Sequence, residues 1–499
     1  MFRRALGLLL GLMLVVLPAF GSAETAFTMA GFDGQDSTRT WEGNGFFNRM
    51  EARTGLSFTF QQYNDSAAWQ AAKNAMFAQN GELPDVLFKA ALTTDELIRY
   101  TESGQLIDLL PLLEENAPNL WALLQENPDW LKAITLPNGK VGALPALQEL
   151  APQNAMWINK AWLDKLGLQE PTDMESLIKV LRAFRDRDPN GNGKKDEVPM
   201  LFLGSWELKF FSHAWGVVAN DYNIYLEDGQ VHYWPLEDSF FEFAQTMRDL
   251  YAEELLDPNG FATSDAIRRV TDSDADITYG AFFAPTPLTL LPYTTGTEHY
   301  VVMGPFEYEG KAAYRDLIGQ VTRGTFAITS ACEDPAALLR WVDILYTEEG
   351  ATEAMAGEEG VNYSYDETGR WDWVGGAEAL GLTGLSELTV YESGEMPWLF
   401  PLAFNDKYVE TNVGRMNDEL SALQAQTVKP FPTYTLTAEE NAYVGSLQLE
   451  LGRYVDEMLA RMVLGEIKIN DKTKAEFLSG LEQRGVADMI AFWQEIAQR

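Results

Sequence analysis

The sequence predicts an α/β protein built as two lobes, and three observations support this fold class. At 499 residues the chain is longer than one hydrophobic core usually fills, so two domains are expected. Over residues 26–150, short apolar strands alternate with amphipathic helices, which is typical of a mostly parallel sheet with helices on both faces. Residues 139–168 then end one such unit and begin another, so this stretch predicts a crossover between lobes.

Polar side chains follow two strands of the first unit. The elements expected there are a strand at 26–31, a helix at 41–53, a strand at 56–61, a helix at 67–78 and a strand at 83–88. Ligands of such sheets bind at the carboxyl ends of the strands. Asp33 and Lys89 come directly after strand ends, so both are candidate ligand-binding residues. The alternative is that both are solvated loop charges.

The crossover stretch contains a polar bridge. Short apolar strands are predicted at residues 140–145 and 155–158, and the residues between them, including Gln148 and Glu149, are too polar for a core. Asn159 then caps a new amphipathic helix. The bridge is either a hinge, with Glu149 facing the ligand and Gln148 supporting it, or an ordinary surface loop.

The composition excludes several classes of function. Residues 1–23 have a positive end, a short apolar run and a small-residue cleavage site, so they predict a secretory signal. Removing it leaves 35 basic and 74 acidic side chains, a formal charge of −39. Nucleic acid and anionic membranes are therefore not expected as partners. The single cysteine, Cys332, predicts neither a disulfide nor a lipid anchor at the cleavage site, so an exported, unanchored protein is expected. We also expect a monomer.

The most specific local motif is an oxygen-rich loop at residues 188–197. Oxygen side chains recur at nearly every other position, glycines let the chain curl, and one backbone carbonyl completes the set. The candidate metal ligands are Asp188, Asn190, Asn192, Lys194 through its carbonyl, Asp196 and Glu197. Such a hard, oxygen-only set favours a structural Ca²⁺. The last acid arrives two positions earlier than in an EF-hand loop, and the alternative is an Asn-Gly-rich turn.

Aromatic residues are abundant after this loop. Most of them are expected to pack in the core, but with 14 tryptophans in the chain a few are expected to line a cleft, with Trp206 among them. The later elements predicted are a hairpin at 225–234, a helix at 240–256, strands at 277–283 and 321–329, a helix from Pro335 to 350, a long helix opened by the capping box Thr437 and Glu440, and two shorter helices that meet at Gly485.

Several motifs together resemble one protein family. They are Leu-Pro-Asp-Val at 83–86, Gly-Ala-Leu-Pro at 142–145, Met-Trp-Ile-Asn-Lys at 156–160, Thr-Phe-Ala-Ile-Thr at 325–329, Asp334-Pro335 and Glu-Glu-Gly at 348–350. This set resembles the extracellular sugar-binding proteins of ABC importers. The loop at 188–197 and the segments 226–231, 360–363 and 455–458 resemble a longer subgroup, which includes alginate-oligosaccharide-binding proteins and many lipoproteins thought to bind sugars.

The resemblance implies a periplasmic-binding-protein type II fold with hinge crossovers. Lobe 1 would comprise residues 24–147 and 325–395, and lobe 2 residues 156–318 and 402–499. The lobes would close over an oligosaccharide and hand it to a membrane permease. Matching positions imply polar ligand contacts from Asp33, Lys89 and Glu149, and aromatic platforms from Phe282 and Trp398. The chain departs from many of the lipoproteins in lacking an anchor cysteine, and it has Phe282 where a tryptophan is often found.

A sugar ligand is also favoured by the residue types present. Sugars offer apolar ring faces and hydroxyl edges, so their sites combine aromatic platforms with carboxylates and amides. A binding protein without enzymatic activity is therefore expected. The alternatives are a secreted glycoside hydrolase, which needs two carboxylates roughly 5–10 Å apart, and a binding protein for a non-sugar solute such as a peptide.

Overall fold

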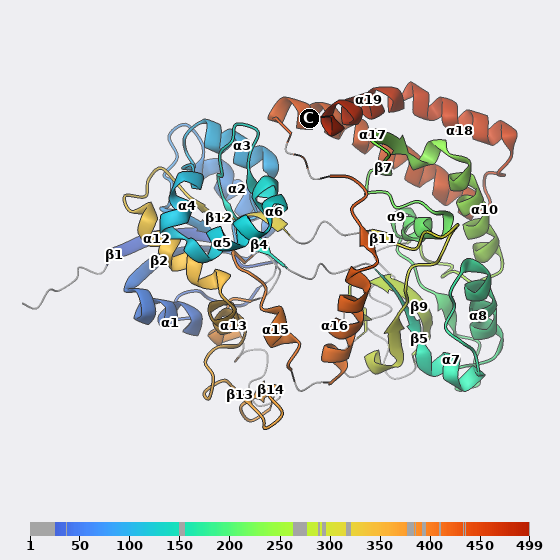
Figure 1. Ribbon diagram of the computed structural model, residues 1–499, viewed down its shortest axis with the longest axis horizontal. Coiled ribbons are helices and arrows are strands. Elements are labelled where there is room, and N and C mark those ends of the chain that lie inside the picture. Colours follow the sequence, from blue (N-terminus) through green and yellow to red (C-terminus); the bar gives the residue numbers. More distant parts are fainter. Residues whose placement is uncertain are drawn as a thin grey trace, which may run out of the picture.

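The computed structural model contains two lobes, each built around its own sheet (Figure 1). The residues that it describes are 25–35, 37–148, 155–262, 277–287, 290–291, 296–315, 321–376, 384, 386–391, 396–408, 411–432, 434 and 436–498. The predicted signal segment and Glu149 lie outside these ranges. The α/β fold class predicted from the sequence is confirmed.

Lobe 1 contains a five-stranded sheet in the order β2-β1-β3-β12-β4. β1 (Thr25–Phe32) runs parallel to β2 (Leu56–Tyr63) and to β3 (Val86–Phe88). β12 (Val321–Ile328) is antiparallel to both β3 and β4 (Leu144–Leu147). Four of the five strands run in one direction, but only the two pairings of β1 are parallel, because the reversed strand β12 lies between β3 and β4. β12 is the strand that enters lobe 1 on the return of the chain from lobe 2.

Helices cover both faces of this sheet because neighbouring residues of a strand point to opposite sides. Phe88 and Phe326 pack with Trp341 in one buried cluster, whereas Leu87 and Ala327 belong to another. The helices of lobe 1 are α1 (Gly45–Thr54), α2 (Ser66–Met76), α3 (Thr94–Glu102), α4 (Leu110–Asn116), α5 (Pro118–Glu126), α6 (Pro128–Ile134), α12 (Pro335–Asp343), α13 (Glu348–Ala356) and α15 (Leu402–Asn405), with a hairpin of β13 (Tyr363–Tyr365) and β14 (Trp371–Trp373) below them in Figure 1.

Lobe 2 contains a four-stranded sheet in the order β10-β5-β9-β6. β5 (Ala155–Asn159) is antiparallel to β9 (Tyr279–Ala284) and β10 (Tyr300–Val302), and β6 (Val198–Met200) is parallel to β9. Its helices include α7 (Lys160–Leu166), α8 (Met174–Asp186), α9 (Ser205–Leu208), α10 (Asp238–Ala252), α16 (Thr411–Gln424), α17 (Ala438–Val463), α18 (Asp471–Gln483) and α19 (Val486–Ala497), and its short paired strands are β7 (Ile224–Glu227) with β8 (Gln230–Tyr233) and β11 (Tyr314–Arg315) with β15 (Thr427–Val428).

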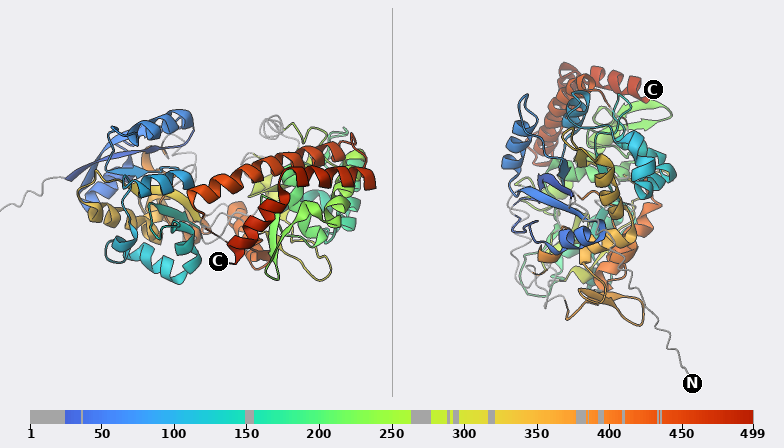
Figure 2. Two further views of the ribbon diagram at one scale, coloured as in Figure 1. Left: turned by 90° about the horizontal axis from the view of Figure 1, so that it is seen from above. Right: turned by 90° about the vertical axis from the view of Figure 1, so that its left-hand side faces the viewer.

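Several local predictions are confirmed. The Asn159 side chain accepts from the Trp162 amide at 3.0 Å, and that helix ends at Gly167 in the left-handed conformation. Thr437 and Glu440 form the predicted capping box of α17. The long helix α17 reaches from lobe 2 toward lobe 1 (Figure 2), where Asn441 Nδ2 donates to Asp95 Oδ1 of α3 at 2.7 Å.

Two predicted elements differ from the structure. The strand expected at 140–145 is β4 at Leu144–Leu147, because the preceding residues bond to lobe 1 loops: the Leu109 amide donates to the Val141 carbonyl at 2.8 Å. The helix expected from Pro335 to 350 breaks after Asp343 into a short 3-10 turn and restarts as α13, where the Thr347 side chain caps the new helix. Within the described ranges, no helix combines the length and apolarity needed to cross a membrane.

Candidate functional site

Three segments that lead to or from lobe 2 lie side by side on the lobe 1 side. Val321, where β12 begins, pairs with Leu147 at the end of β4. The Leu147 amide donates to the Trp398 carbonyl at 2.7 Å, and the Phe400 amide donates to the Leu147 carbonyl at 2.8 Å. We call this arrangement the crossing junction. Gln148, the next residue along, is partly buried, and its contact with a ligand stays a prediction.

Asp33 and Lys89 form a buried ion pair at the carboxyl ends of β1 and β3. Lys89 Nζ lies 2.9 Å from Asp33 Oδ1, and neither side chain is exposed. Arg39 Nη1 lies 3.3 Å from Asp33 Oδ2. Trp41 Nε1 and Ser37 Oγ also donate to this carboxylate, at 3.0 and 2.6 Å. The structure thus brings the two predicted residues together as partners of each other, and a direct contact of either with a ligand stays a prediction.

The Asp33 carboxylate stays ionised despite its burial. Burial alone would raise its pKa, but the charge of Lys89 and the hydrogen bonds from Ser37, Lys89 and Trp41 lower the pKa below its ordinary value. In the sequence, Asp33 and Lys89 were identifiable by their places after strands. Arg39 and Trp41 were missed, because nothing in the loop between β1 and α1 indicated that these side chains turn back toward β1.

The backbone after Lys89 is strained and tightly held. Lys89 and Ala91 have φ angles of 51° and 47°, in a region that non-glycine residues rarely adopt. Trp69 Nε1 donates to the Ala90 carbonyl at 2.8 Å, and Lys73 Nζ donates to the Ala91 carbonyl at 3.1 Å. Strained backbone that its surroundings hold in place is characteristic of functional sites, so we include this loop in the candidate site.

Aromatic side chains gather in lobe 2 beside Arg315, which ends β11. Trp206 of α9 is 47% exposed, and its ring meets Phe210 edge-on with centroids 5.6 Å apart. Phe210 in turn contacts Phe283 of β9 at 5.6 Å. The Arg315 guanidinium, at the end of β11, lies 5.5 Å from the Phe210 centroid and pairs with Asp221 at 2.7 Å. An exposed tryptophan supported by packed rings is a surface on which the apolar face of a sugar ring can stack.

The other two aromatic candidates are buried. Phe282 is 1% exposed and contacts Tyr300 with centroids 4.9 Å apart. Trp398 is 3% exposed and contacts Tyr391 at 5.3 Å and Phe400 at 5.8 Å. Both rings are therefore accounted for by packing, and their predicted ligand contacts stay predictions. Phe282 and Phe283 are adjacent on β9 and therefore face opposite sides of the sheet. The sequence alone did not show which of the two faces which side.

The oxygen-rich loop between α8 and β6 folds back on itself. The amides of Gly191 and Gly193 donate to the Asp188 carboxylate at 2.9 and 3.1 Å. Both glycines have positive φ angles, which is the conformation that glycine tolerates best. The side-chain amides of Asn190 and Asn192 both donate to Asp196, at 3.0 Å for the shortest contact of each. The loop therefore gathers its oxygen-bearing side chains within one short turn.

One carboxylate of this loop lacks compensation. Glu197 Oε1 is buried and, within the described part of the chain, has no hydrogen-bond partner. Burial raises the pKa of Glu197, and the charges of Asp188 and Asp196 raise it further. No three acidic, histidine or cysteine side chains of the described residues form a metal-binding cluster. The predicted ligand set includes two asparagines and the Lys194 carbonyl, and its orphaned carboxylate oxygen fits a bound cation.

Among the buried titratable side chains of lobe 2 are Glu207 and His213, which the sequence gave no reason to select. Burial raises the pKa of Glu207 to about 8, although its carboxylate accepts from the Leu203 amide at 2.6 Å. Burial lowers the pKa of His213 to about 4, and the ring nitrogen Nδ1 lies 2.8 Å from the Phe210 carbonyl. Both side chains are consequently neutral or largely neutral at pH 7. Glu207 and His213 are 4% and 5% exposed, and we do not include them among the candidate ligand-binding residues.

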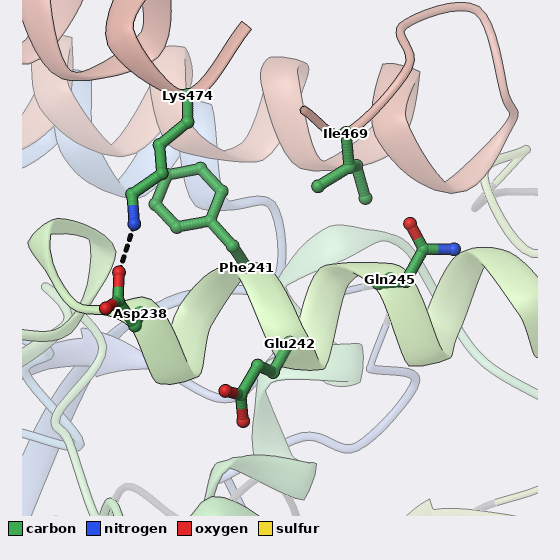
Figure 3. Close-up of a pocket in the computed structure, with 6 residues that line it drawn as sticks. All are labelled: Asp238, Phe241, Glu242, Gln245, Ile469 and Lys474. Carbon is green, nitrogen blue, oxygen red and sulfur yellow. Dashed lines mark hydrogen bonds and ion pairs between the residues drawn. The ribbon is translucent and has the colours of Figure 1, made fainter. Parts of the chain in front are cut away.

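A groove of about 530 Å³ lies on the outer side of lobe 2, between α10 and the start of α18 (Figure 3). Lys474 forms an ion pair with Asp238 and lies 5.0 Å from the Phe241 ring centroid. Its charge is therefore already neutralised, and the groove contains none of the residues at the crossing junction. We do not assign the ligand to this groove.

The chain belongs to the bacterial extracellular solute-binding protein family, whose model matches residues 40–352. The resemblance that the motifs carried is thereby confirmed. The fructooligosaccharide ABC transporter substrate-binding protein FusA of Streptococcus pneumoniae is 25% identical over 473 residues, which cover 90% of this chain and 85% of FusA.

Two solved structures share this fold over 95% of the chain. The S. pneumoniae FusA EF-hand mutant in complex with fructo-nystose has a TM-score of 0.73 at 21% identity, with 99% of that chain covered. The alginate-binding protein AlgQ2 without calcium ion has a TM-score of 0.70 at 19% identity, with 98% covered. The two-lobed fold is therefore shared along essentially the whole length of these proteins.

Proposed function

We propose that this protein captures an oligosaccharide between its two lobes and delivers it to the membrane permease of an ABC importer. The observation that carries the proposal is the match to FusA along 90% of the chain. Two features support it: Trp206 in lobe 2 offers an exposed ring supported by Phe210, and the buried pair of Asp33 and Lys89 fixes the loops at the strand ends of lobe 1. The apolar face of a sugar ring stacks on an exposed aromatic ring, and fixed loops can present polar groups to the hydroxyl edges.

Closure of the lobes would be guided from two places. The crossing junction ties the three connecting segments together by backbone hydrogen bonds. On the side of α17, lobe 2 also touches lobe 1 directly: Lys429 pairs with Asp129 at 3.1 Å, and Lys132 lies 5.0 Å from the Tyr434 ring centroid. Rotation about these contacts would bury the sugar hydroxyls, so affinity would depend on the equilibrium between open and closed forms.

Isothermal titration calorimetry of the mature protein against a broad panel of neutral and acidic oligosaccharides tests this function. We expect at least one saturable binder that is recovered chemically unchanged. A panel without any binder would refute the proposal. Release of new reducing ends from a bound glycan would instead support a glycoside hydrolase. The relatives are named as substrate-binding proteins, so we expect no such release.

We further propose that the loop at residues 188–197 holds a structural Ca²⁺. The ligands would be Asp188, Asn190, Asn192, Asp196, Glu197 and the Lys194 carbonyl, and the orphaned Glu197 Oε1 supports this assignment. The ion would supply the positive charge that offsets three nearby carboxylates.

Chelation tests the calcium proposal. A ligand that binds only the folded state at 100 times its Kd stabilises that state by about 2.7 kcal/mol. We therefore expect EGTA to lower the thermal midpoint and added Ca²⁺ to restore it, with no such response in Asp196→Asn. Identical midpoints with EGTA and with Ca²⁺ would contradict the assignment.

The predicted export of the chain also belongs to this proposal. Cleavage after Ala23 would release a mature protein that begins at Glu24 and acts outside the cytoplasmic membrane as a monomer. Mass spectrometry of the exported protein checks the cleavage position, and light scattering checks the monomer.

A further inference from the structure

One cation at the edge of lobe 1 differs from its neighbours. Lys89 pairs with Asp33, and Lys73 pairs with Glu96, each at 2.9 Å. Arg323 is partly buried as well, yet its side chain forms no ion pair or hydrogen bond with any residue that the structure describes. Burial lowers the pKa of its guanidinium, and no carboxylate offsets this effect. The group still carries its charge at neutral pH, because arginine remains protonated in proteins.

Arg323 occupies an irregular position in β12. The register of β12 against β4 shifts between Thr322 and Phe326. Next to Arg323, Gly324 has a φ of 74°, and a Cβ atom there would lie 2.3 Å from the Leu92 carbonyl oxygen. The Leu92 amide also donates to the Gly324 carbonyl at 3.1 Å. The Arg323 backbone therefore lies against the strained loop that follows Lys89.

The same position lies close to the crossing junction. Val321, two residues before Arg323, pairs with Leu147 there. The strained loop begins at the carboxyl end of β3, and β1 and β3 are parallel. Ligands of α/β sheets bind at this edge. Arg323 thus stands where a ligand held between the lobes would meet lobe 1.

Two buried carboxylates of lobe 1, Asp33 and Glu96, are already engaged. Asp33 contacts both Lys89 and Arg39, and Glu96 accepts from Lys73, Gln70 and the Thr93 amide. Among the described residues, some side-chain nitrogen and oxygen atoms are inaccessible to solvent and have no hydrogen-bond partner, and the Arg323 nitrogen atoms are not among them. The guanidinium is therefore poorly hydrated but still reachable, and its charge is not compensated within the described protein. Such an arrangement is costly unless a partner arrives from outside.

We propose that the captured oligosaccharide carries an anionic substituent, a carboxylate or a sulfate group, and that Arg323 binds it. This inference rests on the proposed function and specifies its ligand class. A guanidinium offers two parallel N–H donors that match the paired oxygens of either group. Closing the lobes over a neutral sugar would desolvate Arg323 further without supplying a counter-charge.

The overall charge of the protein does not oppose this inference. The formal net charge is −37, but at physiological ionic strength exposed charges are screened over about 8 Å. An anionic ligand held between the lobes therefore responds mainly to the groups within contact distance. In this proposal Arg323 is such a group.

Matched ligands and variants test the proposal. The probes are a uronic acid trisaccharide, the same trisaccharide with its carboxyl groups reduced to alcohols, and a sulfated neutral trisaccharide. We expect the mature protein to bind one anionic probe at least about tenfold more tightly than the reduced probe. Arg323→Gln should remove this preference and change affinity for the reduced probe less than about threefold. Preference for the uronate or for the sulfated probe identifies the group.

Arg182→Gln is the control, because Arg182 pairs with Glu253 on the exposed surface of lobe 2 and should leave the preference intact. Equal affinities for anionic and reduced probes, or an equal loss for both in Arg323→Gln, would overturn the inference. If neutral fructooligosaccharides bind and no anionic probe does, the proposed function stands and this inference falls. If no glycan binds at all, the proposed function itself fails. A thermal midpoint of Arg323→Gln that does not fall below that of the native protein confirms that the fold is intact.

Discussion

The candidate residues of the two lobes differ in their chemistry. In lobe 1 they are buried charges held in ion pairs, namely Asp33 with Lys89 and Arg39, and Lys73 with Glu96. In lobe 2 they belong to a row of aromatic rings, and two buried titratable groups of this lobe, Glu207 and His213, are held in neutral form.

This difference separates two tasks of a sugar-binding site. Buried ion pairs fix loops in one geometry, because breaking such a pair leaves an uncompensated charge. Aromatic rings supply a flat apolar surface with little directional demand. We infer that lobe 1 sets the position of polar groups, whereas lobe 2 supplies the contact area. Single substitutions can remove the buried ion pair of lobe 1, the buried carboxyl group of lobe 2 and the exposed ring of lobe 2, one at a time.

The largest effect is expected in lobe 1 from Lys89→Ala. The variant leaves the Asp33 carboxylate buried with one of its cations removed, and we expect a loss of about 3–5 kcal/mol in the free energy of unfolding. Denaturant unfolding measures the loss, and hydrogen exchange of β1 and β3 localises it to lobe 1.

Lys179→Ala is the matched control, because Lys179 pairs with Glu175 on an exposed helix face and should show no measurable change. If Lys89→Ala lowers the free energy of unfolding no more than this control does, the buried ion pair does not stabilise lobe 1.

A smaller, pH-dependent effect is expected in lobe 2 from Glu207→Gln. The folded protein holds a proton on Glu207 up to about pH 8, whereas the unfolded chain releases it near the ordinary pKa of 4.5. The stability of the native protein therefore falls as pH rises from about 4.5 to 8. A side-chain amide at this position would mimic the protonated carboxyl, so Glu207→Gln should remove this part of the pH dependence.

Thermal unfolding between pH 6.5 and 8.5 checks the Glu207 prediction. In this range His213, whose pKa is lowered to about 4 in the folded protein, stays neutral there. Its titration in the unfolded chain near the ordinary pKa of 6.5 is the same in both proteins and cancels in the comparison. We expect the difference in thermal midpoint between Glu207→Gln and the native protein to increase in favour of the variant as pH rises. The surface variant Glu253→Gln should show no such increase. Parallel pH profiles for Glu207→Gln and the native protein would contradict the assignment.

The contrast between the lobes also explains how far the sequence could predict the site. Strand and helix periodicity placed β1, β3 and β12, and the rule that ligands meet strand ends singled out Asp33 and Lys89. The pattern could not show that these two charges contact each other, because their pairing depends on the parallel register of β1 and β3. It also gave no sign that Arg39 and Trp41 return to Asp33.

Burial of aromatic residues was equally hard to predict. Trp206 and Trp398 stand in similarly aromatic stretches, yet one is 47% and the other 3% exposed. The difference comes from tertiary neighbours: Trp398 leads into the crossing junction, whereas Trp206 lies on a short helix with one ring beside it. Arg323 was detectable in principle as the one charged residue of the predicted strand at 321–329. That Arg323 has no ion-pair partner among the described residues could be seen only in the structure, which shows where the carboxylates lie.

The smallest effect on stability, and a clear one on binding, is expected from Trp206→Ala. Because nearly half of the Trp206 side chain is exposed and its ring touches Phe210 only edge-on, its removal should barely change the thermal midpoint. If the ring stacks on a sugar, affinity for a glycan identified by calorimetry should fall about tenfold, which corresponds to about 1.4 kcal/mol. Trp206→Phe should retain most of the affinity, since a flat ring remains.

Trp398→Ala provides the opposite pattern, because that buried ring supports the crossing junction and its loss should lower stability by about 3–5 kcal/mol. Equal affinity of Trp206→Ala and the native protein would show that lobe 2 contributes its contact area through residues other than this exposed ring.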